Sequence, residues 1–233
     1  MDDAKFVANM PVTHATFETA KNVRRTAARP VRNRWRDGGK AVAEWLLALV
    51  AVLALSPLLL AIAAVIAASN GRPIIHRRRV VGRGGMEFDA FKFRTMVSGA
   101  ERVLEQDERL REQFTKNWKL FADPRVTGVG RVLRKYSLDE LPQLLNVLRG
   151  EMAVIGPRMI SPPELERYGQ LGSKLCSVRP GLTGLWQVSG RQTVSYARRI
   201  ELDMFYIDNC SLRFDVSILL RTLPVVVRAE GAF

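Results

Sequence analysis

The stretch WLLALVAVLALSPLLLAIAAVIAA, residues 45–68, decides the architecture of this chain. It contains 24 residues without a charged side chain, which is long enough for a helix to cross the hydrocarbon core of a bilayer. Pro57 lies in the middle, directly after Ser56, and proline removes a helical hydrogen bond and clashes with the preceding turn. The sequence therefore predicts a membrane helix bent at Ser56 and Pro57, with halves that are each about 17 Å long.

Basic residues flank this apolar run on both sides. Four lie within residues 32–40, and five lie within residues 72–83. Since Lys and Arg accumulate on the cytoplasmic side of a membrane, a spanning helix would place one basic flank on the wrong side. A re-entrant helix, which enters and leaves by the cytoplasmic face, satisfies both flanks. Proline is also tolerated in ordinary transmembrane helices, so a kinked span is the alternative.

The chain of 233 residues has a formal net charge of +13, which indicates a polyanionic partner such as nucleic acid, anionic lipid or a phosphorylated substrate. Residues 1–40 carry nine Lys and Arg against four acids and lack an apolar period, so we expect a disordered basic tail against lipid headgroups. We expect a membrane helix over 41–70 and a cytoplasmic domain over 71–233. Cys176 and Cys210 lack metal-site spacing, which predicts two reduced thiols and no zinc.

The pattern of apolar residues predicts an α/β fold that is mainly helical and has one small β-hairpin. Short strands are expected at 74–81 and 88–93, around the glycine-rich turn 82–85. Helical spacing predicts helices over the ranges 97–121, 137–149, 164–175, 194–209 and 212–227, with a short turn of helix at 131–135. The apolar helix 212–227 is expected either to lie on the membrane surface as an interfacial amphipathic helix or to pack against the core.

Two neighbouring carboxylates, Asp139 and Glu140, open the expected helix 137–149. Ser137 and Glu140 fit a capping box, which is a purely structural interpretation. Pro142 fits that interpretation badly, because it would fall at the fifth helical position, so a distorted turn is expected. Adjacent helical residues point about 100° apart, so the two carboxylates are suited to different tasks.

The functional interpretation of this pair is phosphoryl chemistry. Asp139 would be a nucleophile towards phosphorus, and Glu140 would hold Mg²⁺ together with substrate phosphates. Arg134 and Arg158 would neutralise phosphate oxygens through forked hydrogen bonds. Further candidates for binding phosphate or substrate, each a weak signal alone, are Lys92, Arg94, Arg179, Gln187 and Arg191.

These residues lie in motifs that together are specific. The motifs are KFRTM (92–96), DPRVT (123–127), LRKYSLDELPQLLNVLRGEM (133–152), GPR (156–158), RPGLTGLWQVSGR (179–191) and the spaced Asp203 and Tyr206. Through them the chain from about Lys40 onwards resembles the bacterial sugar transferase family. That family comprises monotopic polyprenyl-phosphate hexose-1-phosphate transferases, and the resemblance is closest to members that initiate exopolysaccharide synthesis.

The resemblance implies a re-entrant helix bent at Ser56 and Pro57, at the cytoplasmic face of a bacterial inner membrane. It implies that Asp139 attacks the β-phosphate of a UDP-sugar, releases UMP and passes the sugar phosphate to undecaprenyl phosphate. Glu140 would bind Mg²⁺, and Arg134 would hold phosphate. Glucose or galactose is expected as the sugar. A homo-oligomer is an open option.

Three positions depart from the family pattern, namely Val80, Met159 and Cys210, and they put substrate contacts near those turns in doubt. One alternative function is a membrane-tethered basic binding module without catalysis. A nucleic-acid partner is not expected, because the basic stretch 77–83 has no interleaved aromatic residues. A second alternative is direct transfer in a ternary complex with Asp139 as general base. A carboxylate beside Arg134 is expected to stay ionised and be a weak base, which favours the nucleophile.

Overall fold

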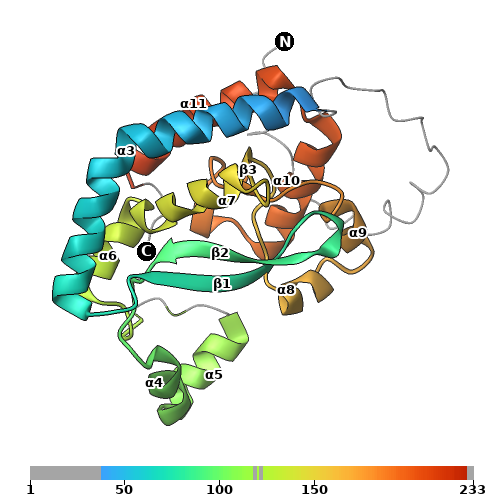
Figure 1. Cartoon of the computed structure of the whole chain (residues 1–233). Coiled ribbons are helices and arrows are strands. Elements are labelled where there is room, and N and C mark those ends of the chain that lie inside the picture. The colour runs from blue at the N-terminus through green and yellow to red at the C-terminus, as the bar shows by residue number, and fades with distance from the viewer. Residues whose placement is uncertain (1–37, 118–119, 121–122, 230–233) are drawn as a thin grey trace.

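The computed structural model describes residues 38–117, 120 and 123–229, so the expected basic tail lies almost entirely outside the described residues. The helices and strands are α3 (Lys40–Asn70), β1 (Ile75–Val81), β2 (Glu87–Phe93), α4 (Ala100–Gln106), α5 (Glu108–Asn117), α6 (Gly128–Lys135), α7 (Leu144–Leu148), β3 (Ala153–Ile155), α8 (Pro162–Glu166), α9 (Gly172–Leu175), β4 (Gly181–Thr183), α10 (Tyr196–Asn209) and α11 (Leu212–Val227). The expectation of a mainly helical fold with a small hairpin is confirmed (Figure 1).

Helix α3 is one helix of 31 residues with Pro57 inside it, and it is long and apolar enough to cross a membrane. Figure 1 shows it changing direction near its middle. Pro57 has no N–H to give to the carbonyl of Leu53 one turn earlier. The hydroxyl of Ser56 donates to that carbonyl instead, at 2.8 Å. The Ser-Pro pair therefore bends the helix and also satisfies the carbonyl that the proline leaves free.

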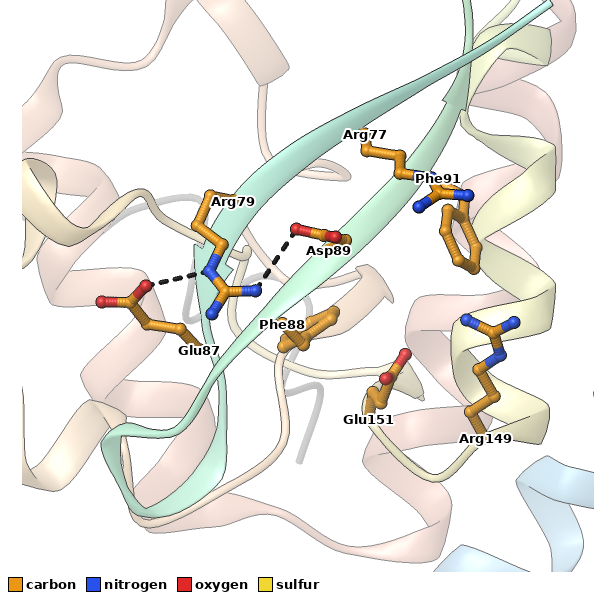
Figure 2. Close-up of a pocket in the computed structure, with 8 residues that line it drawn as sticks. All are labelled: Arg77, Arg79, Glu87, Phe88, Asp89, Phe91, Arg149 and Glu151. Atoms are coloured by element: carbon orange, nitrogen blue, oxygen red, sulfur yellow. Dashed lines mark hydrogen bonds and ion pairs between the residues drawn. The ribbon is translucent and has the colours of Figure 1, made fainter.

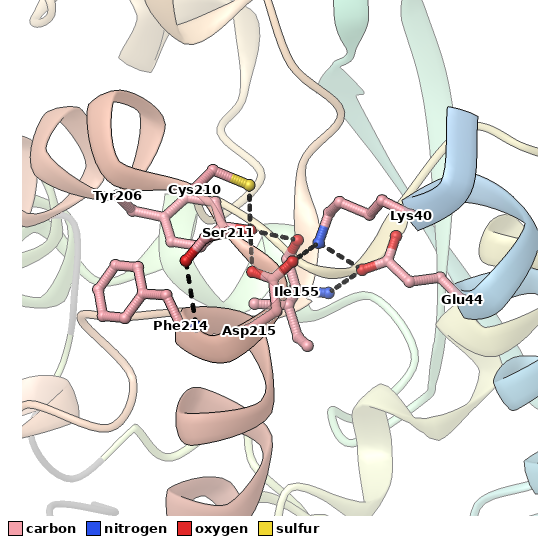
Figure 3. A network of polar contacts seen from close by, with 8 residues as sticks. All are labelled: Lys40, Glu44, Ile155, Tyr206, Cys210, Ser211, Phe214 and Asp215. Atoms are coloured by element: carbon pink, nitrogen blue, oxygen red, sulfur yellow. Dashed lines mark hydrogen bonds and ion pairs between the residues drawn. The ribbon is translucent and has the colours of Figure 1, made fainter. Parts of the chain in front are cut away.

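A buried ion-pair network holds the beginning of α3 (Figure 3). Lys40 Nζ lies 2.7 Å from both Glu44 Oε1 and Asp215 Oδ2. Glu44 Oε1 also accepts the backbone N–H of Ile155 at 2.9 Å, and Tyr206 donates its hydroxyl to Asp215 at 2.7 Å. The first turn of α3 is thus joined to β3, α10 and α11.

The end of α3 is held by Arg94, the residue that follows β2. Its guanidinium donates to the carbonyl of Asn70 and, at 2.8 Å, to that of Gly71. The side chain of Asn70 donates to Thr127 at 3.2 Å. Both ends of α3 are therefore fixed to the same body of the molecule.

Two small sheets organise the rest of the chain. In the predicted hairpin, β1 and β2 pair antiparallel, with Arg78 opposite Ala90. The second sheet, which was not predicted, pairs β3 and β4 in parallel. A Cβ on Gly181 would lie 2.1 Å from the backbone nitrogen of Gly156, so only glycine permits this close approach. The contact brings the segments of residues 156–158 and 179–184 together.

The core lies between the hairpin, α7, α10 and α11. Its fully buried apolar members include Val80, Met152, Met159, Ile160, Leu185 and Ile218. Helix α11 packs against this core through Ile218 and, on its other side, exposes the apolar residues Leu212, Val216, Leu220, Leu223 and Val227. The helix therefore contacts the core and also presents an apolar stripe at the surface.

Three expected helices have different bounds from those predicted. The helix expected over 97–121 is two helices, α4 and α5, separated at Asp107. The helix expected over 164–175 is divided into α8, a 3-10 turn and α9. In place of the helix expected over 137–149 there is a 3-10 helix, η4 (Leu138–Gln143), followed by α7.

Candidate active site

The carboxylate pair lies in η4, and the capping-box interpretation of its sequence is wrong. Ser137 has a left-handed backbone, with φ of 53°, and makes no side-chain cap. Its hydroxyl instead accepts a hydrogen bond from Arg191. The expected distorted turn is confirmed, because Pro142 lies inside a 3-10 helix. The turn that carries Asp139 and Glu140 is therefore held by contacts from distant segments, of Arg191 with Ser137 and of Lys92 and Arg158 with Glu140.

Glu140 is clamped by two cations. Lys92 Nζ lies 2.6 Å and Arg158 Nη2 lies 3.0 Å from the same oxygen, Oε1. The glutamate side chain is 17% exposed. Although burial opposes it, the charges and hydrogen bonds of Arg158 and Lys92 hold the pKa of Glu140 far below its usual range. Glu140 is therefore ionised and fixed in place, with Oε2 taking no part in these two ion pairs.

Asp139 is different from its neighbour. Asp139 is 7% exposed, and no donor within the described ranges makes a hydrogen bond to its side chain. Burial and, less strongly, the charge of Glu140 raise the pKa of Asp139, while Lys92, Arg134 and Arg158 oppose the rise. The expectation of a weakly basic carboxylate is therefore wrong in direction. A buried carboxylate without hydrogen-bond donors is a stronger nucleophile, and also a stronger base, than an exposed one.

The other predicted site residues divide into two groups. Arg134 and Arg191 lie near the pair, since Asp139 acts electrostatically on both arginines. Arg134 Nε donates to Thr95 at 2.9 Å, which orients its guanidinium. Arg94, in contrast, is occupied at the end of α3, as described above, so its predicted contact with substrate stays a prediction.

Gln187 and Arg179 come from the glycine-rich segment that supports Arg158. Both amide atoms of Gln187 are buried, and neither has a partner among the described residues. The backbone carbonyl of Arg179 lies close to Gly156. Within the described chain, no hydrogen bond or ion pair joins the side chain of Arg179 to Asp139 or Glu140. Their roles in substrate binding stay predictions.

A layer of aromatic and charged residues behind Arg158 was not predicted as part of the site. The guanidiniums of Arg158 and Arg199 lie 5.5 and 5.2 Å from the ring of Trp186. Arg199 is also 3.9 Å from Glu164, which pairs with Arg78 at 2.9 Å. This alternation of cations, rings and acids fixes Arg158 and thereby Glu140. The sequence pattern assigns Arg78 to a basic membrane flank and to an expected strand, and no local signal connects it to Glu164, Arg199 or Trp186.

Asp203 lies at the base of this layer. It is 1% exposed and accepts a hydrogen bond from Tyr168 at 2.9 Å. Burial raises the pKa of Asp203 to about 6, although Arg199 and the Tyr168 hydroxyl oppose the rise. The resemblance had indicated Asp203 as a motif residue without a role, and the structure places it beneath Arg199.

Comparison with known proteins identifies the lineage of this site. A family model described as "Bacterial sugar transferase" matches residues 35–229. The chain belongs to the bacterial sugar transferase family. The sequence resemblance is thereby confirmed. This sugar transferase is 45% identical over 192 residues to the exopolysaccharide production protein ExoY of Sinorhizobium fredii, covering 81% of this chain and 85% of that protein.

Two longer relatives carry names that state a reaction. One is the undecaprenyl-phosphate galactose phosphotransferase of Salmonella typhimurium, which is 46% identical over 168 residues, covering 70% of this chain. The other is the UDP-glucose:undecaprenyl-phosphate glucose-1-phosphate transferase of Xanthomonas campestris, which is 37% identical over 202 residues, covering 83% of this chain. The matches cover only 35% and 40% of those two proteins.

The carboxylates of the site can be compared with what a metal ion requires. No group of three or more His, Cys, Asp and Glu side chains is arranged to hold a metal within the described residues. Mg²⁺ is commonly bound by one or two carboxylates plus substrate phosphates and water, and it needs no such cage. Glu140, with one oxygen outside its ion pairs, fits that mode.

Proposed function

We propose that this sugar transferase moves a hexose 1-phosphate from a UDP-sugar to undecaprenyl phosphate, with Asp139 as the covalent carrier. The contrast within the carboxylate pair carries the proposal. Asp139 has no hydrogen-bond donor among the described residues, whereas Glu140 is clamped by Lys92 and Arg158. The reactions named for the Salmonella and Xanthomonas relatives support the substrate classes.

In the first step an oxygen of Asp139 attacks the β-phosphorus of the UDP-sugar. The bond from that phosphorus to the bridging oxygen breaks, and UMP leaves with the electron pair. The sugar 1-phosphate is then an acyl phosphate on Asp139. Arg134 and Arg158, which both act on the Asp139 charge, lie where they can neutralise the phosphate oxygens as charge moves to the leaving group.

In the second step an oxygen of the lipid phosphate attacks the same phosphorus. The acyl phosphate bond breaks, Asp139 is regenerated, and the product is a sugar joined to the lipid by a diphosphate. The raised pKa of Asp139 is compatible with the alternative, in which it acts as a general base. However, a phosphate monoester has a second pKa of about 6, so the acceptor is already ionised and needs no base. This favours the nucleophile.

We propose Glu140 as the protein ligand of Mg²⁺. The ion, when bound, neutralises diphosphate oxygens as a Lewis acid. Lys92 and Arg158 keep the Glu140 carboxylate ionised and fix its direction, so that it is ready to contact a cation without rearranging.

We further propose that α3 is re-entrant and that the enzyme is monotopic, on the cytoplasmic face of a bacterial inner membrane. Two contacts support this: Lys40 with Asp215 at the start of α3, and Arg94 with Gly71 at its end. A spanning helix would place these ends on opposite sides of the bilayer, and one of the two attachments would then break. The basic flanks of α3 favour the cytoplasmic side.

The test of function uses the purified full chain with undecaprenyl phosphate and Mg²⁺, and scores UMP release from UDP-glucose and UDP-galactose. We expect release with at least one donor and none above background for Asp139→Asn. Asp208→Asn is the matched control, because Asp208 is an exposed aspartate paired with Lys174. Full activity of Asp139→Asn would overturn the assignment.

The test of topology uses cysteines placed at the exposed positions Val42 and Arg72, near the two ends of α3, in a Cys176→Ser/Cys210→Ala background. A membrane-impermeant thiol reagent is applied to vesicles of each orientation. We expect both positions to react from the same side. Reaction from opposite sides would establish a spanning helix.

A further inference from the structure

A cavity of about 350 Å³ opens beside the hairpin of β1 and β2 (Figure 2). Arg77 and Phe91 are cross-strand partners that line it. Because successive side chains point to opposite faces of a strand, Lys92 points away from this cavity and reaches Glu140 instead. The cavity is therefore separate from the candidate active site.

Two arginines converge on Phe91 inside this cavity. The guanidinium carbons of Arg77 and Arg149 lie 5.9 and 4.7 Å from the ring centroid. Figure 2 shows the ring between the two side chains. Both arginines are exposed, and neither forms an ion pair with a carboxylate within the part of the chain that the structure describes. Two guanidiniums that are held on one ring, outside any ion pair among the described residues, can both donate to one anion.

The acids of the cavity limit the charge of that anion. Glu87 and Asp89 are engaged by Arg79, at 3.0 and 3.4 Å. Glu151, which also lines the cavity, accepts a hydrogen bond from the amide of Asn146 at 2.6 Å. The whole lining thus has three arginines against three carboxylates, and Arg79 is the arginine that is shared by two of those acids. Because the lining as a whole is charge-balanced, a singly charged phosphodiester that contacts Arg77 and Arg149 meets less repulsion from the three carboxylates than a phosphate monoester or a diphosphate would.

The cavity also adjoins the beginning of α3. Trp45 Nε1 donates to the carbonyl of Leu148 at 3.0 Å, and Arg149 is the next residue. The Trp45 indole is 43% exposed, and tryptophan is enriched at the headgroup level of membranes. If α3 enters the bilayer as proposed above, on which this step rests, Arg149 lies at the level of the lipid phosphates.

We propose that this cavity binds the phosphodiester group of a membrane phospholipid, with Arg77 and Arg149 donating to its non-bridging oxygens. The bound lipid would fix the hairpin and the end of α7 against the membrane surface, on the side away from Asp139. The site is therefore a lipid contact distinct from the site of the acceptor, whose phosphate must reach Asp139.

The test is a titration of the purified full chain in detergent with phosphatidylglycerol, followed by native mass spectrometry. We expect Arg77→Gln/Arg149→Gln to bind the lipid about tenfold more weakly than the unmodified chain, through loss of two charge-assisted contacts. Arg83→Gln is the matched control, because Arg83 is an exposed arginine in the turn of the same hairpin and does not line the cavity. It is expected to bind as the unmodified chain does.

Glycerol 3-phosphate and inorganic phosphate serve as soluble competitors, and we expect neither to displace the lipid. Equal lipid affinity of the double variant and the unmodified chain would overturn the proposal, as would displacement by either soluble phosphate. If the double variant does not fold, Arg149→Gln alone replaces it, with the same expected direction. UMP release by the same variants is measured in parallel, so a failed lipid site and a failed transferase assignment give different results.

Discussion

Lys92 Nζ lies 2.6 Å from Glu140 Oε1, and this contact joins the hairpin to the turn that carries both carboxylates. Lys92 also lowers the pKa of the neighbouring Asp139 through its charge. One lysine thus fixes the glutamate and favours the ionised, nucleophilic form of the aspartate. The contact spans 48 positions of the sequence, so its loss would affect both candidate catalytic groups at once.

Replacing Lys92 by methionine is expected to move the acidic limb of the pH–rate profile to higher pH. Burial already raises the pKa of Asp139, and removing the lysine charge raises it further, so attack by the ionised carboxylate is lost at a higher pH. The measurement is kcat/KM for UMP release against pH. Lys174→Met, at an exposed ion pair with Asp208, is the control and should leave the limb in place. An unchanged limb in Lys92→Met would contradict the electrostatic role.

Glu140→Gln is expected to lower kcat/KM by about a hundredfold or more, because a metal ligand and the partner of two cations are lost together. We also expect the Mg²⁺ concentration for half-maximal activity to rise. Measuring UMP release across a Mg²⁺ titration separates the two effects. An unchanged Mg²⁺ dependence would remove Glu140 from the metal site, even if activity fell.

Asp203→Asn is expected to make stability less dependent on pH. The folded protein raises the pKa of Asp203 to about 6 from the usual 3.8, so it favours the protonated form. That contribution is complete below the unfolded pKa and is lost as pH rises through about 6, up to about 3 kcal/mol. Asparagine mimics the protonated acid and should lose less stability as pH rises to about 7. Thermal unfolding in detergent checks this, and slopes of Tm against pH that match the unmodified chain would contradict it.

Lys40→Met is expected to destabilise the protein by about 3 kcal/mol or more, since it leaves Glu44 and Asp215 buried without their cation. The exposed-pair variant Lys174→Met should cost less than about 1 kcal/mol. Thermal unfolding of both variants provides the comparison. Similar Tm values for the two variants would show that the network of Figure 3 contributes no more than a surface ion pair.

Local sequence patterns predicted the strands and helices whose apolar residues recur with a regular period. The two hairpin strands and the range of α11 agree with their apolar patterns within a residue or so. The single helix expected over 97–121 fails at Asp107, whose side chain accepts the N–H of Leu110 at 3.0 Å and so begins a new helix. The short parallel pair β3 and β4 has too few residues to leave a pattern.

The sequence predicted which residues form the candidate site better than it predicted the contacts between them. Asp139 and Glu140 stood out as neighbouring acids in a turn that Pro142 distorts. The groups that contact this turn come from distant segments. Sequence spacing therefore could not show that Arg191 donates a hydrogen bond to the hydroxyl of Ser137, which then does not cap the expected helix. For the same reason the part that Arg94 plays at the end of α3 was not foreseen. Contacts between distant segments depend on the fold, and they produce no regular spacing of residues in the sequence.

The central claim is most directly tested by a rapid-quench reaction of the purified chain with UDP-hexose labelled in the sugar, with Mg²⁺ and without undecaprenyl phosphate. The covalent route through Asp139 predicts one equivalent or less of UMP, with the label on the peptide that contains Asp139 and no label on Asp139→Asn. Peptide mapping by mass spectrometry locates the label. Release of UMP only after the lipid phosphate is added, with no labelled peptide at any time, would contradict the covalent route.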